Sequence, residues 1–156
     1  MKKIIILLSL ISFNVLGAGT SSSTDNSTVT SEQIIKLYEL AEKHIDNNSY
    51  DKSLKLLKKL TKREDLGTKR ADIYNLLGFS YRKLENPDLD KSFAAYMMAI
   101  EIDPSHLGAH EYLGELYLMR DQKDKAIKML EKLNQLAGSN TEEYRELKIA
   151  IDQYQS

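Results

Sequence analysis

The chain has 156 residues, of which 42% are hydrophobic and 29% charged, so a single domain with a packed core is expected. Lys and Arg number 22 against 23 Asp and Glu, which excludes the basic surplus typical of nucleic-acid-binding proteins. The absence of cysteine excludes disulfides, thiolate metal sites and a cysteine nucleophile, and the 2 prolines and 7 glycines leave a composition that favours helix.

The first residues follow the order of a secretory signal. Lys2 and Lys3 precede an apolar run over 4–16, and small residues follow at 17–19. The run is shorter than the roughly 20 residues that a membrane-spanning helix needs. We therefore expect a signal peptide over 1–19 and export to a bacterial periplasm. The alternative is an uncleaved signal that anchors the protein, and it is the only membrane contact we expect.

A polar segment over 20–31 separates the signal from the rest of the chain. It contains one apolar residue in twelve, Val29, and consists otherwise of Ser, Thr, Asp and Asn. Such a segment buries too little surface to offset its ordering entropy, so a disordered Ser/Thr-rich tether is expected.

Beyond the tether, apolar residues fall at helical spacing in a pattern that occurs three times. The three copies start at Ile34, Ala71 and Leu107, which lie 37 and 36 residues apart. Each copy has a large residue, a leucine, a small residue and a large ring-bearing or aromatic residue at i, i+3, i+4 and i+7, followed by a second apolar helix with its own small residue. The first helices supply Leu37, Leu40, Ala41 and His44; Tyr74, Leu77, Gly78 and Tyr81; and His110, Leu113, Gly114 and Tyr117.

The small-residue columns have a packing explanation. A glycine inside a helix costs up to about 1 kcal/mol, so its use at Gly78 and Gly114 indicates that another helix approaches closely there. The small residues of the second helices, at Ser53, Ser92 and Ala126, are expected to lie across that contact. Pro104 marks the end of the second helix of the middle copy.

These columns resemble the tetratricopeptide repeat family over about 31–136, most strongly where residues 110–130 read H-E-Y-L-G-E-L-Y-L-M-R-D-Q-K-D-K-A-I-K-M-L. The resemblance implies an all-α solenoid over 32–140 with three helix-turn-helix repeats, at about 34–67, 71–106 and 107–140. Asn140 and Glu143 form an expected capping pair that opens a C-terminal capping helix over 141–156.

The end of the chain also resembles small exported bacterial tetratricopeptide proteins of unassigned function. Members of that set often carry two cysteines before the last helix, and the matching positions here are Ala137 and Thr141. Any role that depends on such a cysteine pair is therefore absent.

In the tetratricopeptide family the first helices line a concave groove that holds a peptide. Carried over to this chain, the resemblance implies a peptide-binding groove lined by Tyr38, Glu42, Asn75, Phe79, Arg82, Glu111, Tyr112, Glu115 and Met119. Its aromatic and acidic side chains favour an unknown protein or peptide of basic and apolar character. Two alternatives remain open: these residues form only a solvated face, or the protein is a self-associating structural subunit with no separate ligand.

An enzyme is not expected, and neither a catalytic residue, a metal nor a cofactor is assigned. His106 and His110 have a spacing that can bind zinc or copper, but a site needs three or four converging ligands, so core packing of His110 is favoured. The string beginning at His110 lacks the second histidine of H-E-x-x-H because position 114 is glycine. The basic run over 52–63 is interpreted as a solvated convex face, with contact to anionic lipid as the alternative.

Overall fold

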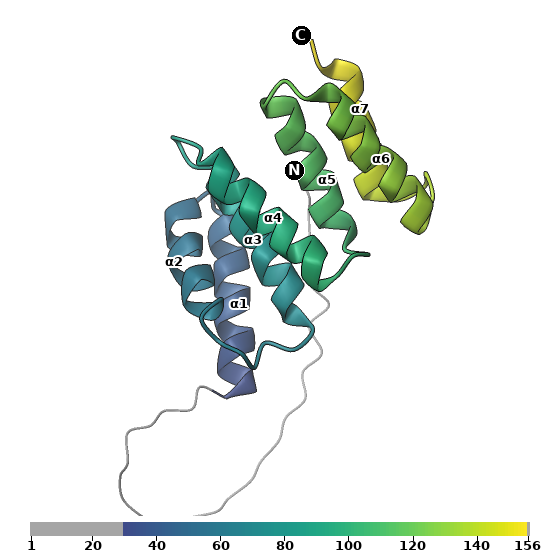
Figure 1. Ribbon diagram of the computed structural model, residues 1–156. Coiled ribbons are helices and arrows are strands. Elements are labelled where there is room, and N and C mark those ends of the chain that lie inside the picture. The colour runs from purple at the N-terminus through teal and green to yellow at the C-terminus, as the bar shows by residue number, and fades with distance from the viewer. Residues whose placement is uncertain (1–29, 156) are drawn as a thin grey trace, which may run out of the picture.

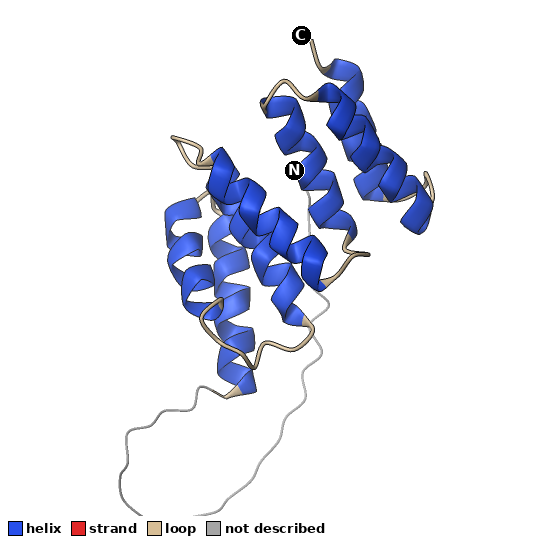
Figure 2. Ribbon diagram, in the orientation of Figure 1, coloured by secondary structure: helices blue, strands red, loops and turns tan. Residues whose placement is uncertain are grey.

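The computed structural model describes residues 30–155, and this part of the chain is entirely helical and loop, with no strand (Figure 2). Its seven helices are α1 (Ser31–Asp46), α2 (Tyr50–Leu60), α3 (Lys69–Arg82), α4 (Leu89–Ile102), α5 (Leu107–Met119), α6 (Lys123–Ala137) and α7 (Glu142–Gln153). The expected signal peptide over 1–19 and nearly all of the expected tether lie outside the described residues. The tether's last residue, Ser31, is the first residue of α1.

The helices stack as consecutive pairs. The most extensive packing joins α1 to α2, α3 to α4 and α5 to α6, while α2 packs on α3 and α4 packs on α5 to link successive pairs (Figure 1). The first helices also touch one another, α1 with α3 and α3 with α5, and α7 covers both α5 and α6. This confirms the expected all-α solenoid of three helix pairs closed by a C-terminal helix.

Polar side chains cap the N-termini of several helices. Thr30 caps α1 in a capping box with Gln33, and Asp88 caps α4 by accepting a hydrogen bond from the backbone N–H of Lys91 at 3.0 Å. At α7 the sequence expectation was wrong by one residue. The cap is Thr141, whose hydroxyl accepts from the N–H of Tyr144 at 3.3 Å, because Thr141 has the extended backbone that precedes the helix.

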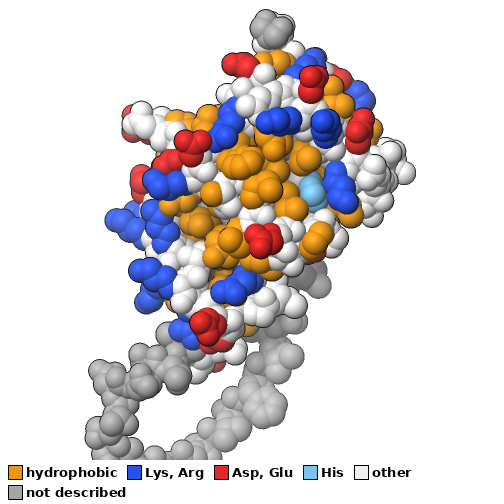
Figure 3. Space-filling model, viewed as in Figure 1, with side chains coloured by type: hydrophobic (Ala, Val, Ile, Leu, Met, Phe, Trp, Pro, Cys, Tyr) orange, Lys and Arg blue, Asp and Glu red, His pale blue; other side chains and the backbone are white. Residues whose placement is uncertain are grey.

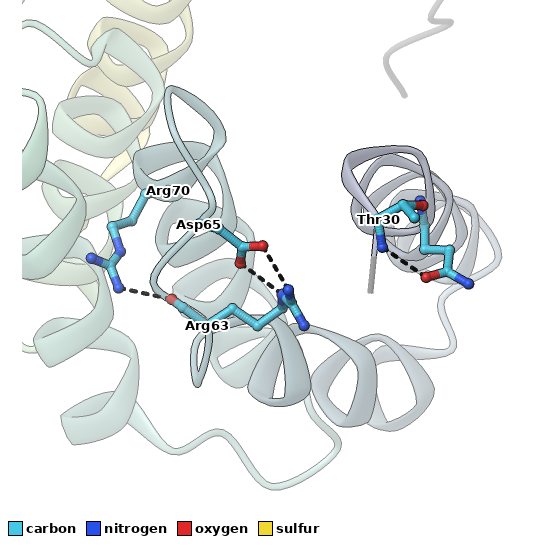
Figure 4. Close-up of polar contacts among 5 residues, drawn as sticks. Thr30, Arg63, Asp65 and Arg70 are labelled. Atoms are coloured by element: carbon cyan, nitrogen blue, oxygen red, sulfur yellow. Dashed lines mark hydrogen bonds and ion pairs between the residues drawn. The ribbon is translucent and has the colours of Figure 1, made fainter. Parts of the chain in front are cut away.

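The connection between α2 and α3 is longer than in a compact repeat, and polar contacts close it (Figure 4). Arg70, in the first turn of α3, donates from Nη2 to the carbonyl of Arg63 at 2.9 Å. The guanidinium of Arg63 donates to both carboxylate oxygens of Asp65, at 2.8 and 2.6 Å. Leu66 then buries itself in the core of the first pairs. The extra residues before Ala71 are thus accommodated in an ordered turn.

The glycine columns are explained by close helix contacts, but not by the same contact in each pair. A Cβ on Gly78 would lie 2.6 Å from Cε1 of Tyr96 in α4, and Ser92 donates a hydrogen bond to the carbonyl of Gly78 at 2.8 Å. A Cβ on Gly114 would instead lie 2.5 Å from Cδ2 of Leu147 in α7. In the last pair the nearest atoms therefore belong to the capping helix, not to the second helix of the pair.

The first helix departs from the expected column. Ile34, Tyr38 and Ala41 are its buried residues, whereas Leu40 is 42% exposed. No described helix pair precedes α1, so the side of α1 that carries Leu40 has nothing to pack against. The column predicted from the later repeats therefore fails in this one.

Candidate functional site

The nine predicted groove residues come from the three first helices, which lie next to one another. Tyr38 and Glu42 belong to α1; Asn75, Phe79 and Arg82 to α3; and the remaining four to α5. Residues 38 and 42 in α1, and 75, 79 and 82 in α3, are three or four positions apart, so each set shares one helix face. The same spacing holds for residues 111, 115 and 119 of α5, with Tyr112 beside them.

Four of these residues form one cluster across α3 and α5. The guanidinium of Arg82 pairs with Glu115, Nη2 to Oε2, at 2.5 Å. It also lies over the rings of Phe79 and Tyr112, at 5.5 and 5.3 Å from their centroids. The two rings are 5.1 Å apart and tilted. We call Phe79, Arg82, Tyr112 and Glu115 the inner cluster.

A residue outside the predicted groove set completes the inner cluster. Tyr96 of α4 is fully buried, and its hydroxyl accepts a hydrogen bond from Nε of Arg82 at 3.3 Å. Its ring lies 6.0 Å from that of Tyr112. Its polar role could not be read from the repeat pattern, because its hydrogen-bond partner, Arg82, lies on another helix.

Burial and charge act in opposite directions on the ionisable groups of the cluster. Burial alone would lower the pKa of Arg82, but the neighbouring Tyr96 and Glu115 raise the pKa above its usual value. Burial, followed by the nearby carboxylates of Glu111 and Glu115, raises the pKa of Tyr112. Arg82 therefore stays charged and is paired with Glu115, and Tyr112 stays a neutral phenol.

Tyr38 and Glu42 of α1 form a second, smaller group beside α3. Lys69 places its Nζ 4.8 Å from the centroid of the Tyr38 ring. Burial, together with the charge of Glu42, raises the pKa of Tyr38, and burial also raises the pKa of Glu42. Lys69 was not predicted as part of the site, since it precedes the repeat pattern by two residues.

Several predicted groove residues are more buried than an open groove would require. Tyr38, Asn75, Arg82 and Glu111 are 8%, 7%, 6% and 2% exposed, respectively. Glu42, Phe79, Tyr112 and Glu115 are partly exposed. Met119, at the end of α5, is 47% exposed. The accessible part of this face is thus the partly exposed residues and Met119, and the four buried residues form the layer below it.

A cavity of about 430 Å³ is lined by residues 48–52 and 83–85 at the α1–α2 and α3–α4 turns.

The two histidines weighed as metal ligands both serve the fold. The Nδ1 atom of His106 accepts from the backbone N–H of Ala109 at 3.2 Å as the cap of α5. His110 is 3% exposed, and its Nε2 lies 3.0 Å from the carbonyl oxygen of Pro104. Over residues 30–155, no three His, Cys, Asp or Glu side chains converge as a metal site would need, and no helix there is long and apolar enough to cross a membrane.

Repeated antiparallel helix pairs with glycine-mediated contacts define the protein as an α-helical repeat protein. Residues 95–128 match the family model of the tetratricopeptide repeat. That window contains the second half of α4, all of α5 and the start of α6. Together with the fold, this match confirms the resemblance: residues 95–128 match a tetratricopeptide repeat, and the other helix pairs have the same helix-turn-helix arrangement.

Known proteins are similar to this chain at low sequence identity. ETO1-like protein 2 of Arabidopsis thaliana is 29% identical over 110 residues, which are 70% of this chain but only 12% of that protein. The type III secretion chaperone SycD of Yersinia enterocolitica, solved with a peptide of the translocator YopD, superposes with a TM-score of 0.66 at 18% identity, covering 82% of this chain and 93% of SycD. The first tetratricopeptide domain of Spaghetti (RPAP3), bound to the HSP90 peptide SRMEEVD, gives 0.64 at 17% identity, covering 82% and 100%.

Proposed function

We propose that the protein is a non-enzymatic interaction module of a bacterial cell envelope, and that it binds a basic and apolar peptide segment on the face formed by α1, α3 and α5. Two of the structural relatives were solved with peptides, which makes a peptide the natural partner class for this fold. The location rests on the signal-like residues 1–19.

The inner cluster is the observation that carries the proposal. Arg82 lies over both rings and is held by Glu115, so the aromatic surface of Phe79 and Tyr112 is already ordered before any ligand arrives. A preordered aromatic surface loses little conformational entropy on binding, which is where much of the cost of association lies.

The charge of this face selects the ligand. Arg82 and Glu115 compensate each other within the cluster, which leaves Glu42 as the partly exposed carboxylate of the predicted set that is in no ion pair with another described residue. An acidic peptide would be repelled and a basic one attracted. Self-association with no separate ligand is the alternative, and it predicts that no peptide binds here.

The test is selection of peptides on the full chain from a random displayed library, followed by titration of one selected peptide in soluble form. We expect selected sequences enriched in Lys, Arg and large apolar residues. Glu42→Lys and Met119→Lys should each weaken binding about tenfold, since both lie at accessible positions of the face. Neither side chain belongs to the inner cluster, so folding should be retained.

Ile127→Lys is the matched control, because Ile127 is 37% exposed on α6, outside the proposed face. It should leave peptide affinity unchanged. Failure to select any peptide, or equal weakening by Ile127→Lys, would contradict the groove assignment. The location is tested separately: exported protein should begin after Ala18 or Gly19 by intact mass, and retention of residues 1–19 would indicate a membrane anchor instead.

A further inference from the structure

The outer surface of the middle helix pair carries an unusual number of exposed apolar side chains. On α4, Met97, Met98 and Ile102 are 43%, 38% and 38% exposed, and Ala94, one turn earlier, is also exposed. In Figure 3, hydrophobic side chains gather over the middle of the face on which α4 lies in Figure 1, with charged side chains around them. Clustered apolar exposure of this kind is typical of interaction surfaces.

The position of α4 makes this surface accessible. The buried side of α4, formed by Ser92, Ala95, Tyr96 and Ala99, packs on α3 and α5. Figure 1 shows α4 in front, between α2 and α6. A partner can therefore lie along α4 without meeting the α1, α3 and α5 face.

The exposed side of α4 has the spacing of a helix-pairing seam. Lys91, Ala94, Met98 and Glu101 are all exposed and follow one another at intervals of three, four and three residues. This is the 3.5-residue repeat by which two helices pack along a common line. Met97 and Ile102 flank the seam. We call these four residues the α4 seam.

The order of residues in the α4 seam is self-complementary when reversed. We propose that a second copy of this chain packs its α4 antiparallel against this α4, about a two-fold axis at the level of residue 96. Lys91 then faces Glu101 of the partner subunit at both ends, and Ala94 faces Met98 of the partner subunit in two central layers. A cation meets an anion and a small side chain meets a large one, each twice, as a two-fold interface requires.

Neither Lys91 nor Glu101 is held in a strong ion pair within its own chain. Lys91 pairs with Asp88 at 2.5 Å, but its side chain is 63% exposed, and an exposed pair of this kind contributes little. Glu101 forms no ion pair with another residue of the described chain. Both can therefore contribute to an interface between copies at little cost.

One 14-residue helix buries less surface than a standard interface, so the dimer should be weak and concentration-dependent. Its consequence is bivalence. Because α4 uses its outer side for pairing, both copies keep their α1, α3 and α5 faces available, and two linked binding faces hold a repeated or dimeric target more strongly than one.

The first test is the sedimentation behaviour of the full chain over a concentration series. The parent should show a monomer–dimer equilibrium. Lys91→Glu and Glu101→Lys should each weaken the dimer about tenfold or more, because like charges then meet at both ends. The double variant should restore it. Neither change should destabilise α4 itself, since Glu is favoured in the first turn of a helix and Lys in the last. Loss of the dimer would therefore not reflect unfolding.

Ile149→Glu is the control, because Ile149 is 52% exposed on α7, away from the α4 seam. It should leave the dimer unchanged. A parent chain that stays monomeric throughout would overturn the proposal. So would a dimer that survives both single reversals.

A second test reports the orientation. The chain has no cysteine, so introduced cysteines have no background. Residues 91 and 101 are about 15 Å apart along one helix, too far for a disulfide within the chain. The double variant Lys91→Cys/Glu101→Cys should form an intermolecular disulfide under mild oxidation, and each single variant should not. Crosslinking by the single variants would indicate parallel packing and overturn the antiparallel model.

Discussion

Arg82 and Glu115 join the second and third helix pairs through an ion pair 2.5 Å long that is largely removed from water. The Arg82 side chain is 6% exposed and that of Glu115 is 26% exposed. Since the two residues lie on α3 and α5, the pair fixes the position of one repeat against the next, as well as ordering the rings of the proposed binding face.

Glu115→Gln should destabilise the protein by about 2 kcal/mol, because it leaves the buried guanidinium of Arg82 without its counter-charge. Urea denaturation followed by far-UV circular dichroism measures this. The matched variant is Arg82→Met/Glu115→Gln, which removes both charges and should recover most of the loss. A double variant at least as unstable as Glu115→Gln would show that the unpaired charge of Arg82 is not the cause of the lost stability.

Gly78→Ala should destabilise the protein by about 2 kcal/mol despite the better helix propensity of alanine. The added Cβ would lie 2.6 Å from Cε1 and 2.7 Å from Cδ1 of the fully buried Tyr96 ring. Gly108→Ala is the control, because its nearest neighbour is the side-chain amide of Asn75 at 3.2 Å. It should change the free energy of unfolding by less than about 1 kcal/mol. Equal effects at both positions would argue against a specific clash at Gly78.

His110 should make stability fall as pH decreases below about 6.5. Burial lowers the pKa of His110, and within the described structure its buried Nδ1 has no hydrogen-bond partner. The unfolded state then binds more protons than the folded state between the lowered pKa and the ordinary value. The contribution of His110 to the free energy of unfolding is thus fully present at a pH above the ordinary histidine pKa, and it is lost as the pH falls through the lowered pKa.

The measurement is the free energy of unfolding of the parent and of His110→Gln from pH 5 to 8. One group contributes a slope of at most about 1.4 kcal/mol per pH unit, and the difference between the two proteins should show a slope of that sign. Parallel pH profiles would mean that His110 is not the titrating group.

Leu147→Ala should destabilise the protein by about 3 kcal/mol. Leu147 is fully buried where α7 covers Gly114, so its removal leaves a cavity between the capping helix and the last pair. Ile149→Ala, two residues away but 52% exposed, should change stability by less than about 0.5 kcal/mol. Equal thermal unfolding of the two variants would show that the packing of α7 on the last helix pair does not stabilise the protein.

The binding face was only partly predictable. The repeat pattern placed Phe79, Arg82, Tyr112 and Glu115 on neighbouring first helices, and the structure brings these four together. It did not indicate that Arg82 would be buried and neutralised, or that Tyr96 of a second helix would complete the cluster. Those relationships depend on how far one helix is rotated against another, which residue spacing within a helix does not specify.

The amino-acid sequence by itself determined the helix pairs and their order, because helical periodicity is a local property of the chain. The tertiary structure decided which side of each helix stays exposed. Leu40 is exposed because no described pair precedes it, Gly114 packs on α7 instead of its own partner helix, and the α4 seam is exposed because the neighbouring pairs cover only the other side of α4. Exposure is set by the neighbours that a helix acquires on folding, and these are not encoded in its own spacing.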